Sequence, residues 1–213
     1  MAYSIKEVYY TLQGEGFHTG RAAVFVRFSG CNLWTGREQD REGAVCTFCD
    51  TDFVGTNGPG GGKFSSAEAL ARHVRGIWDE VAPPSERAFI VCTGGEPFLQ
   101  LDETLIEAFH TANMEVAVET NGTLKAPEGL DWICVSPKAD APLLQTSGHE
   151  LKLVWYQEKA PPERFSELAF EHFYLQPMDG PDAVRFTKEA TAYCLKHPTW
   201  KLSLQTHKML GIP

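Results

Sequence analysis

The chain has 213 residues, of which 43% are hydrophobic and 22% are charged, and its formal net charge at pH 7 is −9. This length and composition predict a single globular domain, 1–213, and argue against a second full domain. The acidic balance argues against nucleic acid as the main partner, because phosphate binding requires a surplus of Lys and Arg. A small-molecule substrate is the better expectation.

The first residues do not resemble a targeting segment. Residues 1–7 lack the basic and apolar regions of a signal peptide, and no uncharged apolar run approaches the length of a membrane span. We therefore expect no membrane association and a cytoplasmic location. In that reducing compartment the six cysteines are expected to be thiols or metal ligands rather than disulfides.

Short apolar runs recur between longer segments of helical period along the chain. The predicted strands are 3–12, 22–28, 88–92, 115–119, 132–135, 150–155, 173–176 and 201–205. Helices are predicted at 66–81, 102–113 and 182–197, and the glycine-rich segment 55–62 is predicted to be a surface loop. This alternation predicts an α/β fold with a mostly parallel sheet and outer helices.

The first predicted helix has the clearest signals. Ser65 and Glu68 have the spacing of a capping box at its start. Its apolar side chains fall on one face, and they are Leu70, Val74, Ile77, Trp78 and Val81. We expect this face to cover the sheet.

Three cysteines lie close together in an irregular stretch after the strand 22–28. Cys46 and Cys49 form a C-x-x-C pair, and fourteen residues separate Cys46 from Cys31. A C-x-x-C pair can bind one metal or cluster, and three thiolates leave one coordination position open. The alternatives from these residues alone are free thiols or a zinc site completed by a group such as His18. The other cysteines, at core-like positions, are assigned no chemistry: Cys92, Cys134 and Cys194.

Polar and glycine-rich segments follow five of the predicted strands. They are 29–31, 93–97, 120–122, 136–138 and 177–179. Because the carboxyl ends of parallel strands lie at one edge of a sheet, these segments predict a ligand site at that edge.

The cysteines and the Gly-Gly-Glu-Pro segment 94–97 together resemble the radical S-adenosylmethionine enzymes, although the commonest spacing in that superfamily is C-x3-C-x2-C. The long insertion between Cys31 and Cys46 is instead similar to that of the 7-carboxy-7-deazaguanine synthases. Further likeness lies in 12–16, 49–51, 119–122, 136–138 and 204–208. The resemblance spans nearly the whole chain, and the order and spacing of the motifs make it specific.

The resemblance implies a partial TIM-like barrel that forms a homodimer. It implies a lyase that converts 6-carboxy-5,6,7,8-tetrahydropterin into 7-carboxy-7-deazaguanine and ammonia, in the biosynthesis of queuosine and other 7-deazapurines. S-adenosylmethionine would be regenerated in each turnover, Mg2+ would be required, and a flavodoxin-type protein would donate electrons. The alternatives are another radical S-adenosylmethionine enzyme, such as a glycyl-radical activase, and a non-catalytic zinc module that binds a protein.

The resemblance also assigns residues within a cluster-binding loop at about 29–63 and beyond it. Cys31, Cys46 and Cys49 would hold three irons of a [4Fe–4S] cluster, whose fourth iron would bind the methionyl end of the cofactor. Thr51 would bind Mg2+. The cofactor would be contacted by Phe48, Gly94, Gly95, Glu96, Ser136, Pro137, Lys138, Gln176, Pro177, Met178 and Asp179.

The substrate is a carboxylated pterin, which needs a cation for its carboxylate and paired donors and acceptors for its guanidine-like edge. Arg27 suits the carboxylate but could equally be a structural ion-pair partner, and Glu15 could brace its loop. The last predicted strand ends a few residues before Pro213, so the terminal carboxylate of Pro213 could fold back to the substrate. The full set of expected substrate contacts is Leu12, Gln13, Gly14, Glu15, Arg27, Thr93 and Pro213.

Overall fold

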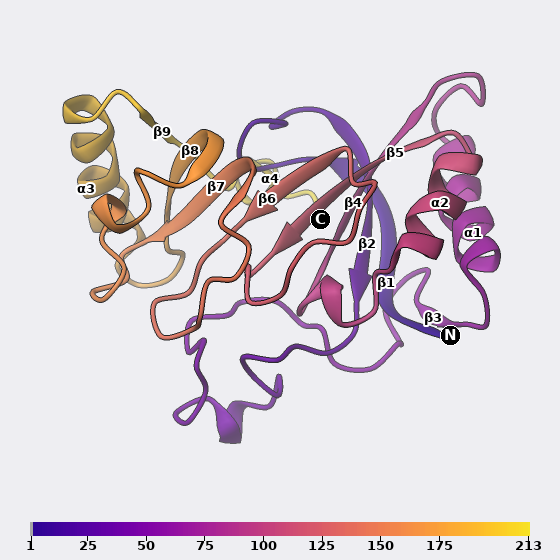
Figure 1. The fold of residues 1–213 in the computed structure, drawn as a ribbon, viewed down its shortest axis with the longest axis horizontal. Coiled ribbons are helices and arrows are strands. Elements are labelled where there is room, and N and C mark those ends of the chain that lie inside the picture. The colour runs from indigo at the N-terminus through magenta and orange to yellow at the C-terminus, as the bar shows by residue number, and fades with distance from the viewer. Residues whose placement is uncertain (1) are drawn as a thin grey trace. The chain divides into compact units, whose positions relative to one another are not determined.

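The computed structural model describes residues 2–213, which group into two compact units (Figure 1). The first unit contains the chain up to Thr11 together with Ala22–Thr120 and Lys125–Ile133. The second unit contains Leu12–Arg21, Asn121–Leu124 and Cys134–Pro213. The single domain 1–213 stays a prediction.

The strands of the first unit follow one order. This order is β3 (Gly62–Phe64), β1 (Tyr3–Leu12), β2 (Ala22–Phe28), β4 (Ala88–Gly94) and β5 (Met114–Thr120). β3 pairs antiparallel with β1, whereas β4 pairs parallel with both β2 and β5. Parallel pairing brings the carboxyl ends of β2, β4 and β5 to the same edge.

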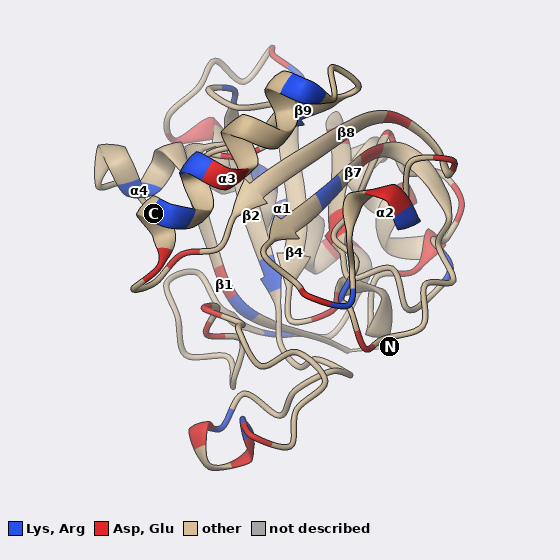
Figure 2. Ribbon diagram, turned by 90° about the vertical axis from the view of Figure 1, so that its left-hand side faces the viewer, with Lys and Arg blue, Asp and Glu red and all other residues tan. Residues whose placement is uncertain are grey.

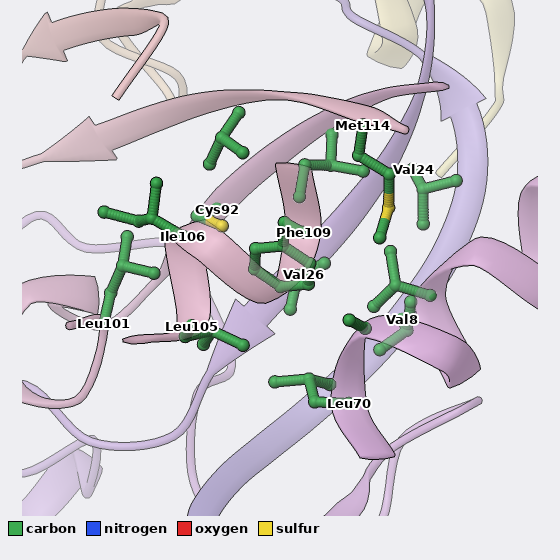
Figure 3. Close-up of a cluster of buried hydrophobic side chains, with 14 of the residues drawn as sticks. Val8, Val24, Val26, Leu70, Cys92, Leu101, Leu105, Ile106, Phe109 and Met114 are labelled. Atoms are coloured by element: carbon green, nitrogen blue, oxygen red, sulfur yellow. The ribbon is translucent and has the colours of Figure 1, made fainter. Parts of the chain in front are cut away.

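Two helices cover one face of these strands, α1 (Ala67–Asp79) and α2 (Glu103–Thr111) (Figure 1). Their apolar side chains pack with alternate residues of the strands into one buried core, part of which Figure 3 shows. Labelled members of this core include Val24, Val26, Leu70, Leu105 and Phe109. The alternate strand residues point to the opposite face, where Ala23, Phe89, Val91 and Ala117 form a second, smaller cluster.

Helix α1 begins one residue later than the capping box predicted. The Ser66 hydroxyl accepts a hydrogen bond from the Ala69 N–H at 3.2 Å, so Ser66 is the N-cap and the assignment to Ser65 was wrong. Leu70, Val74 and Trp78 are buried as predicted, but Val81 is 64% exposed because the helix ends at Asp79.

The strands of the second unit are parallel. The chain enters this unit within β6 (Trp132–Val135) and continues through β7 (Ser147–Trp155), β8 (Ala169–Pro177) and β9 (Trp200–Leu202), in that order. Helix α3 (Ala183–Lys196) packs against β8 and β9. Only Ala190 of this helix is fully buried. Cys194 is half-buried, so its predicted core position was wrong, whereas Cys92 and Cys134 are buried.

The structure differs from the predicted elements mainly near the C-terminus. The strand predicted at 201–205 ends at Leu202, and a short helix, α4 (Thr206–Leu210), follows it and ends at Gly211 in the left-handed conformation. Pro213 therefore does not directly follow a strand. Further elements were not predicted: β3 and the 3₁₀ helices η1 (Glu38–Asp40), η2 (Pro97–Leu99) and η3 (Pro162–Arg164).

The predicted fold class is confirmed. The strands are mostly parallel, helices lie outside them, and the strand order ends at β3 in the first unit and at β9 in the second without closing, as expected of an incomplete TIM-like barrel. Among the residues that the structure describes, the helices are too short or too polar to span a membrane.

Candidate active site

The three clustered cysteines lie in the first unit, in the irregular segment that follows β2. Cys46 is buried, and Cys31 and Cys49 are half-buried. The backbone N–H groups of Val45 and Cys46 donate to the carbonyl of Leu33 at 3.0 and 3.4 Å. The insertion thus closes on itself and returns Cys46 to the neighbourhood of Cys31, although fourteen residues separate them.

The Cys31 sulfur accepts hydrogen bonds from the backbone. Leu33 N donates to Cys31 Sγ at 3.4 Å. Burial raises the pKa of Cys31, while hydrogen bonds from the backbone of Leu33 and Trp34 act in the opposite direction. Such N–H donors stabilise a thiolate, and hydrogen bonds to sulfur are one of the means by which proteins tune iron–sulfur clusters.

The number and kind of donors in the cysteine segment match a cluster with three protein ligands. Among the described residues, no three Cys, His, Asp or Glu side chains converge closely enough to hold one metal ion. Ligands of a cluster each bind a different iron, so they need not meet at one point. Three thiols in one irregular loop therefore fit the donor set of a cluster with three protein ligands.

The end of β4 packs directly against the cysteine loop. A Cβ atom on Gly95 would lie 2.0 Å from the Gly30 carbonyl oxygen and 2.8 Å from Cys31 Cβ, and one on Gly94 would lie 2.4 Å from Phe28 O. Only glycine fits at these positions. The Glu96 N–H then donates to Gly30 O at 2.9 Å, which fixes the segment beside Cys31.

Glu96 is completely buried at this edge. Its Oε1 atom accepts hydrogen bonds from Thr120 Oγ1 at 2.8 Å and from Phe98 N at 3.0 Å. The carboxylate therefore ties the end of β4 to the end of β5 and caps the short helix η2.

Arg27 is paired within the first unit. Its Nε atom donates to Glu7 Oε1 at 2.8 Å and its Nη2 atom donates to the Tyr9 hydroxyl at 2.9 Å. Burial lowers the pKa of Arg27, but Tyr9 and Glu7 more than offset this effect and raise it. The buried Thr93 is the register partner of Arg27 on β4. The contact with Glu7 supports the structural role that the sequence left open for Arg27.

Lys6 of β1 holds the segment that follows Thr51. Lys6 Nζ lies 2.7 Å from Asp52 Oδ2 and donates to Val54 O at 3.0 Å and to Asn57 Oδ1 at 2.9 Å. The hydrogen bond from Lys6 lowers the pKa of Asp52. Thr51 itself is half-buried, as is Phe48.

The loop 12–16 belongs to the second unit and is tightly seated there. The Gly14 carbonyl accepts hydrogen bonds from Thr206 N at 2.9 Å and Thr206 Oγ1 at 3.0 Å. A Cβ atom on Gly14 would lie 2.2 Å from His207 Nδ1. Thr206 and His207 belong to α4. Because the sequence did not predict this helix, the contact with Gly14 was not predicted either.

Glu15 forms a buried ion pair that sequence reasoning missed. Its Oε2 atom lies 2.5 Å from Lys152 Nζ on β7, and the two side chains are 15% and 5% exposed. Gln205 Nε2 donates to Glu15 Oε1 at 3.0 Å. Burial alone would raise the pKa of Glu15, but Lys152 and the hydrogen bonds from Gln205 and Gln176 lower it to about 2. The pair therefore keeps Glu15 ionised.

The remaining predicted residues of the second unit lie at strand ends. Lys138 Nζ donates to Ser136 O at 2.7 Å and to Ser136 Oγ at 2.8 Å. Gln176 is buried and accepts a hydrogen bond from Ser203 Oγ at 2.9 Å. Asp179 pairs with Lys208 of α4 at 2.7 Å.

Three more predicted residues complete this unit. Pro177 ends β8 and Met178 follows it, with Met178 N donating to Trp155 O at 2.5 Å. Pro213 is exposed beyond α4.

Each unit gathers its own share of the predicted site. The first unit holds the cysteines, Phe48, Thr51, Arg27 and 93–96. The second unit holds 12–15, 136–138, 176–179 and Pro213.

Comparisons with known proteins give the family. The chain is 66% identical over 213 residues to a 7-carboxy-7-deazaguanine synthase of Caulobacter vibrioides and 63% identical over 213 residues to one of Bordetella pertussis, with 100% of each chain covered. The chain belongs to the 7-carboxy-7-deazaguanine synthase family. No protein-family model matches it.

A solved structure of the same kind supports the assignment to the 7-carboxy-7-deazaguanine synthases. The crystal structure of QueE from Escherichia coli matches with a TM-score of 0.70 and 27% sequence identity, over 96% of this chain and 94% of that chain. The resemblance drawn from the sequence motifs is thereby confirmed.

Proposed function

We propose that this chain is a radical S-adenosylmethionine lyase that converts 6-carboxy-5,6,7,8-tetrahydropterin into 7-carboxy-7-deazaguanine and ammonia, in queuosine and 7-deazapurine biosynthesis. The observation that carries the proposal is the full-length identity of 66% to a relative named for this product. The cysteine loop adds support from the chain itself, because its thiols suit an iron–sulfur cluster.

Cys31, Cys46 and Cys49 would hold the cluster, and the N–H donor at Cys31 would stabilise its thiolate. When bound, a [4Fe–4S] cluster and S-adenosylmethionine supply the one-electron chemistry that generates a substrate radical. Gly94, Gly95 and Glu96 would bind the cofactor beside Cys31, since Gly95 lets the backbone approach that residue closely. Phe48 would pack next to them.

Lys138 would supply a positive charge for the cofactor carboxylate, and its two hydrogen bonds to Ser136 would orient it. The neighbouring Pro137 would share this contact. The segment 176–179 would lie along the nucleoside part of the cofactor, because Gln176 is buried at the end of β8 and is fixed by Ser203.

The pterin would be bound by 12–15, Arg27, Thr93 and Pro213. An ionised Glu15 can only accept hydrogen bonds, so its pairing with Lys152 suits it to an N–H group of the substrate or to holding the loop. Arg27 would meet the substrate carboxylate while Glu7 and Tyr9 hold its guanidinium in place. Thr51 would bind the Mg2+ ion, which is commonly held by few protein atoms and by the substrate.

The proposal includes a flavodoxin-type electron donor and a homodimeric assembly. It also includes a cytoplasmic location, because cluster thiolates must stay reduced. S-adenosylmethionine would act catalytically and would not be consumed.

The function is tested by anaerobic incubation of the reconstituted protein with reductant, Mg2+, S-adenosylmethionine and 6-carboxytetrahydropterin, followed by mass spectrometry. We expect a product that has lost one ammonia, with the S-adenosylmethionine concentration unchanged and with slower turnover when Mg2+ is omitted. Recovery of unaltered pterin from protein that carries its cluster would refute the proposal.

A further inference from the structure

Arg41 lies within the insertion between Cys31 and Cys46, and its guanidinium contacts several groups at once. Its Nη1 atom donates to the carbonyls of Thr47 and Cys49 at 2.9 and 3.0 Å. Its Nε and Nη2 atoms donate to the Glu38 carboxylate at 2.7 and 2.5 Å. One of its faces lies over the Trp34 ring, 4.0 Å from the centroid.

These contacts connect the insertion to the C-x-x-C pair. The carbonyls of Thr47 and Cys49 belong to an irregular segment outside helices and strands. Trp34 is buried, and its ring packs edge-on against Phe53 at a centroid distance of 5.6 Å. Arg41 therefore connects the buried Trp34 ring to the backbone carbonyls of Thr47 and Cys49. A planar guanidinium with five donors can make all these contacts, whereas an ammonium cannot.

The short helix η1 carries the counter-ion of this arginine. It lies on the loop that extends away from the strands of the first unit at the bottom of Figure 1, and Figure 2 shows acidic and basic residues next to each other there. The Glu38 side chain is 77% exposed, so solvent and salt weaken its attraction for Arg41.

We propose that Arg41 is a positioning residue for the cluster, which holds the C-x-x-C backbone against the insertion and places a positive charge beside the peptide groups of the C-x-x-C pair. This inference rests on the proposed function, since it requires a cluster at Cys31, Cys46 and Cys49. A nearby positive charge favours the reduced cluster, because reduction adds one electron. Arg41 thus makes the cluster both easier to retain and easier to reduce.

Three variants separate these two effects. Arg41→Met removes both the guanidinium hydrogen bonds and the positive charge. Arg41→Lys removes the planar guanidinium, with its several simultaneous hydrogen bonds, but keeps the positive charge. Arg37→Met is the matched control, because Arg37 is an exposed residue of the same insertion and accepts a hydrogen bond from Trp34 Nε1 through its backbone carbonyl, which the substitution keeps. After anaerobic reconstitution, the readouts are the rate of iron loss to a chelator and the midpoint potential from a titration monitored by electron paramagnetic resonance.

We expect Arg41→Met and Arg41→Lys to lose iron several-fold faster than the wild type, and Arg37→Met to lose it at the wild-type rate. In Arg41→Met the ratio of reduced to oxidised cluster at a fixed potential should fall roughly ten-fold, which is about 59 mV for one electron, while Arg41→Lys stays near the wild type. If Arg41→Met does not fold, the rate of iron loss from Arg41→Lys still tests whether Arg41 helps the protein to retain the cluster.

Failure of this inference can be distinguished from failure of the proposed function. A wild-type cluster together with unchanged iron loss in both Arg41 variants, or an unchanged potential in Arg41→Met, would overturn this inference and leave the proposed function intact. A wild-type protein that binds no iron and sulfide would overturn both.

Discussion

At the scale of single residues, the second unit depends on charges that are buried in pairs. Glu15 and Lys152 are almost completely removed from solvent and 2.5 Å apart. Removing one partner of such a pair leaves the other charge buried without compensation, which costs more free energy than the pair itself contributes. Lys152 is therefore expected to hold the loop 12–16 in place.

Replacing Lys152 by Met should lower the free energy of unfolding by about 3–5 kcal/mol, because the Glu15 carboxyl would be buried without its cation and would either stay charged without a partner or take up a proton. Urea denaturation measures this difference. Lys188→Met, on an exposed position of α3, is the matched control and should change stability by no more than about 0.5 kcal/mol. Equal stability of the two variants would show that the ion pair does not hold the loop.

The sequence contains a signal for this pair that the prediction did not use. On β7, the buried Leu151 and Leu153 alternate with Glu150 and Lys152, so the charged residues share one face. The partner of Lys152 was not predictable, because Glu15 lies 137 positions away in the chain and its position depends on the tertiary fold.

At the scale of secondary-structure elements, local patterns predicted most strands and the main helices. The strand 22–28 coincides with β2, and the apolar residues of α2, Leu105, Ile106 and Phe109, are buried as their spacing indicated. The errors lie where the backbone depends on distant contacts. β3 has only three residues and forms by pairing with β1, and α4 is a single short helix that packs by Thr206 on Gly14.

The N-terminus of α1 gives a direct test at this scale. Ser66→Ala should destabilise the protein by about 1 kcal/mol, because the Ala69 N–H would lose its acceptor. Ser65→Ala should have almost no effect, since Ser65 precedes the cap and is exposed. Thermal or urea unfolding of both variants compares them. A larger loss in Ser65→Ala than in Ser66→Ala would contradict the observed cap.

At the scale of the whole molecule, most of the predicted site residues lie near the ends of strands or in the loops that follow them, in both units. The cysteine spacing and the Gly-Gly-Glu segment predicted the part in the first unit, because both motifs are local in the sequence. The residues that hold these segments in place were not predicted. Arg41, Lys6 and Lys152 act through contacts with backbone or buried carboxylates that become neighbours only in the folded chain.

The family assignment and the fold agree at this scale. Relatives with the same name align over the full chain, and the solved QueE structure matches 96% of it. The proposed chemistry therefore depends on whether the three clustered cysteines bind an iron–sulfur cluster.

Iron and acid-labile sulfide analysis of anaerobically purified wild type, Cys46→Ala and Cys194→Ala tests this claim most directly. We expect about four irons and four sulfides per wild-type chain, and the same in Cys194→Ala, because Cys194 is a half-buried residue of α3 without an assigned role. Cys46→Ala should lose the brown chromophore and the reductive cleavage of S-adenosylmethionine. A Cys46→Ala protein that keeps its full cluster and full cleavage activity, or a wild type with zinc and no sulfide, would contradict the account.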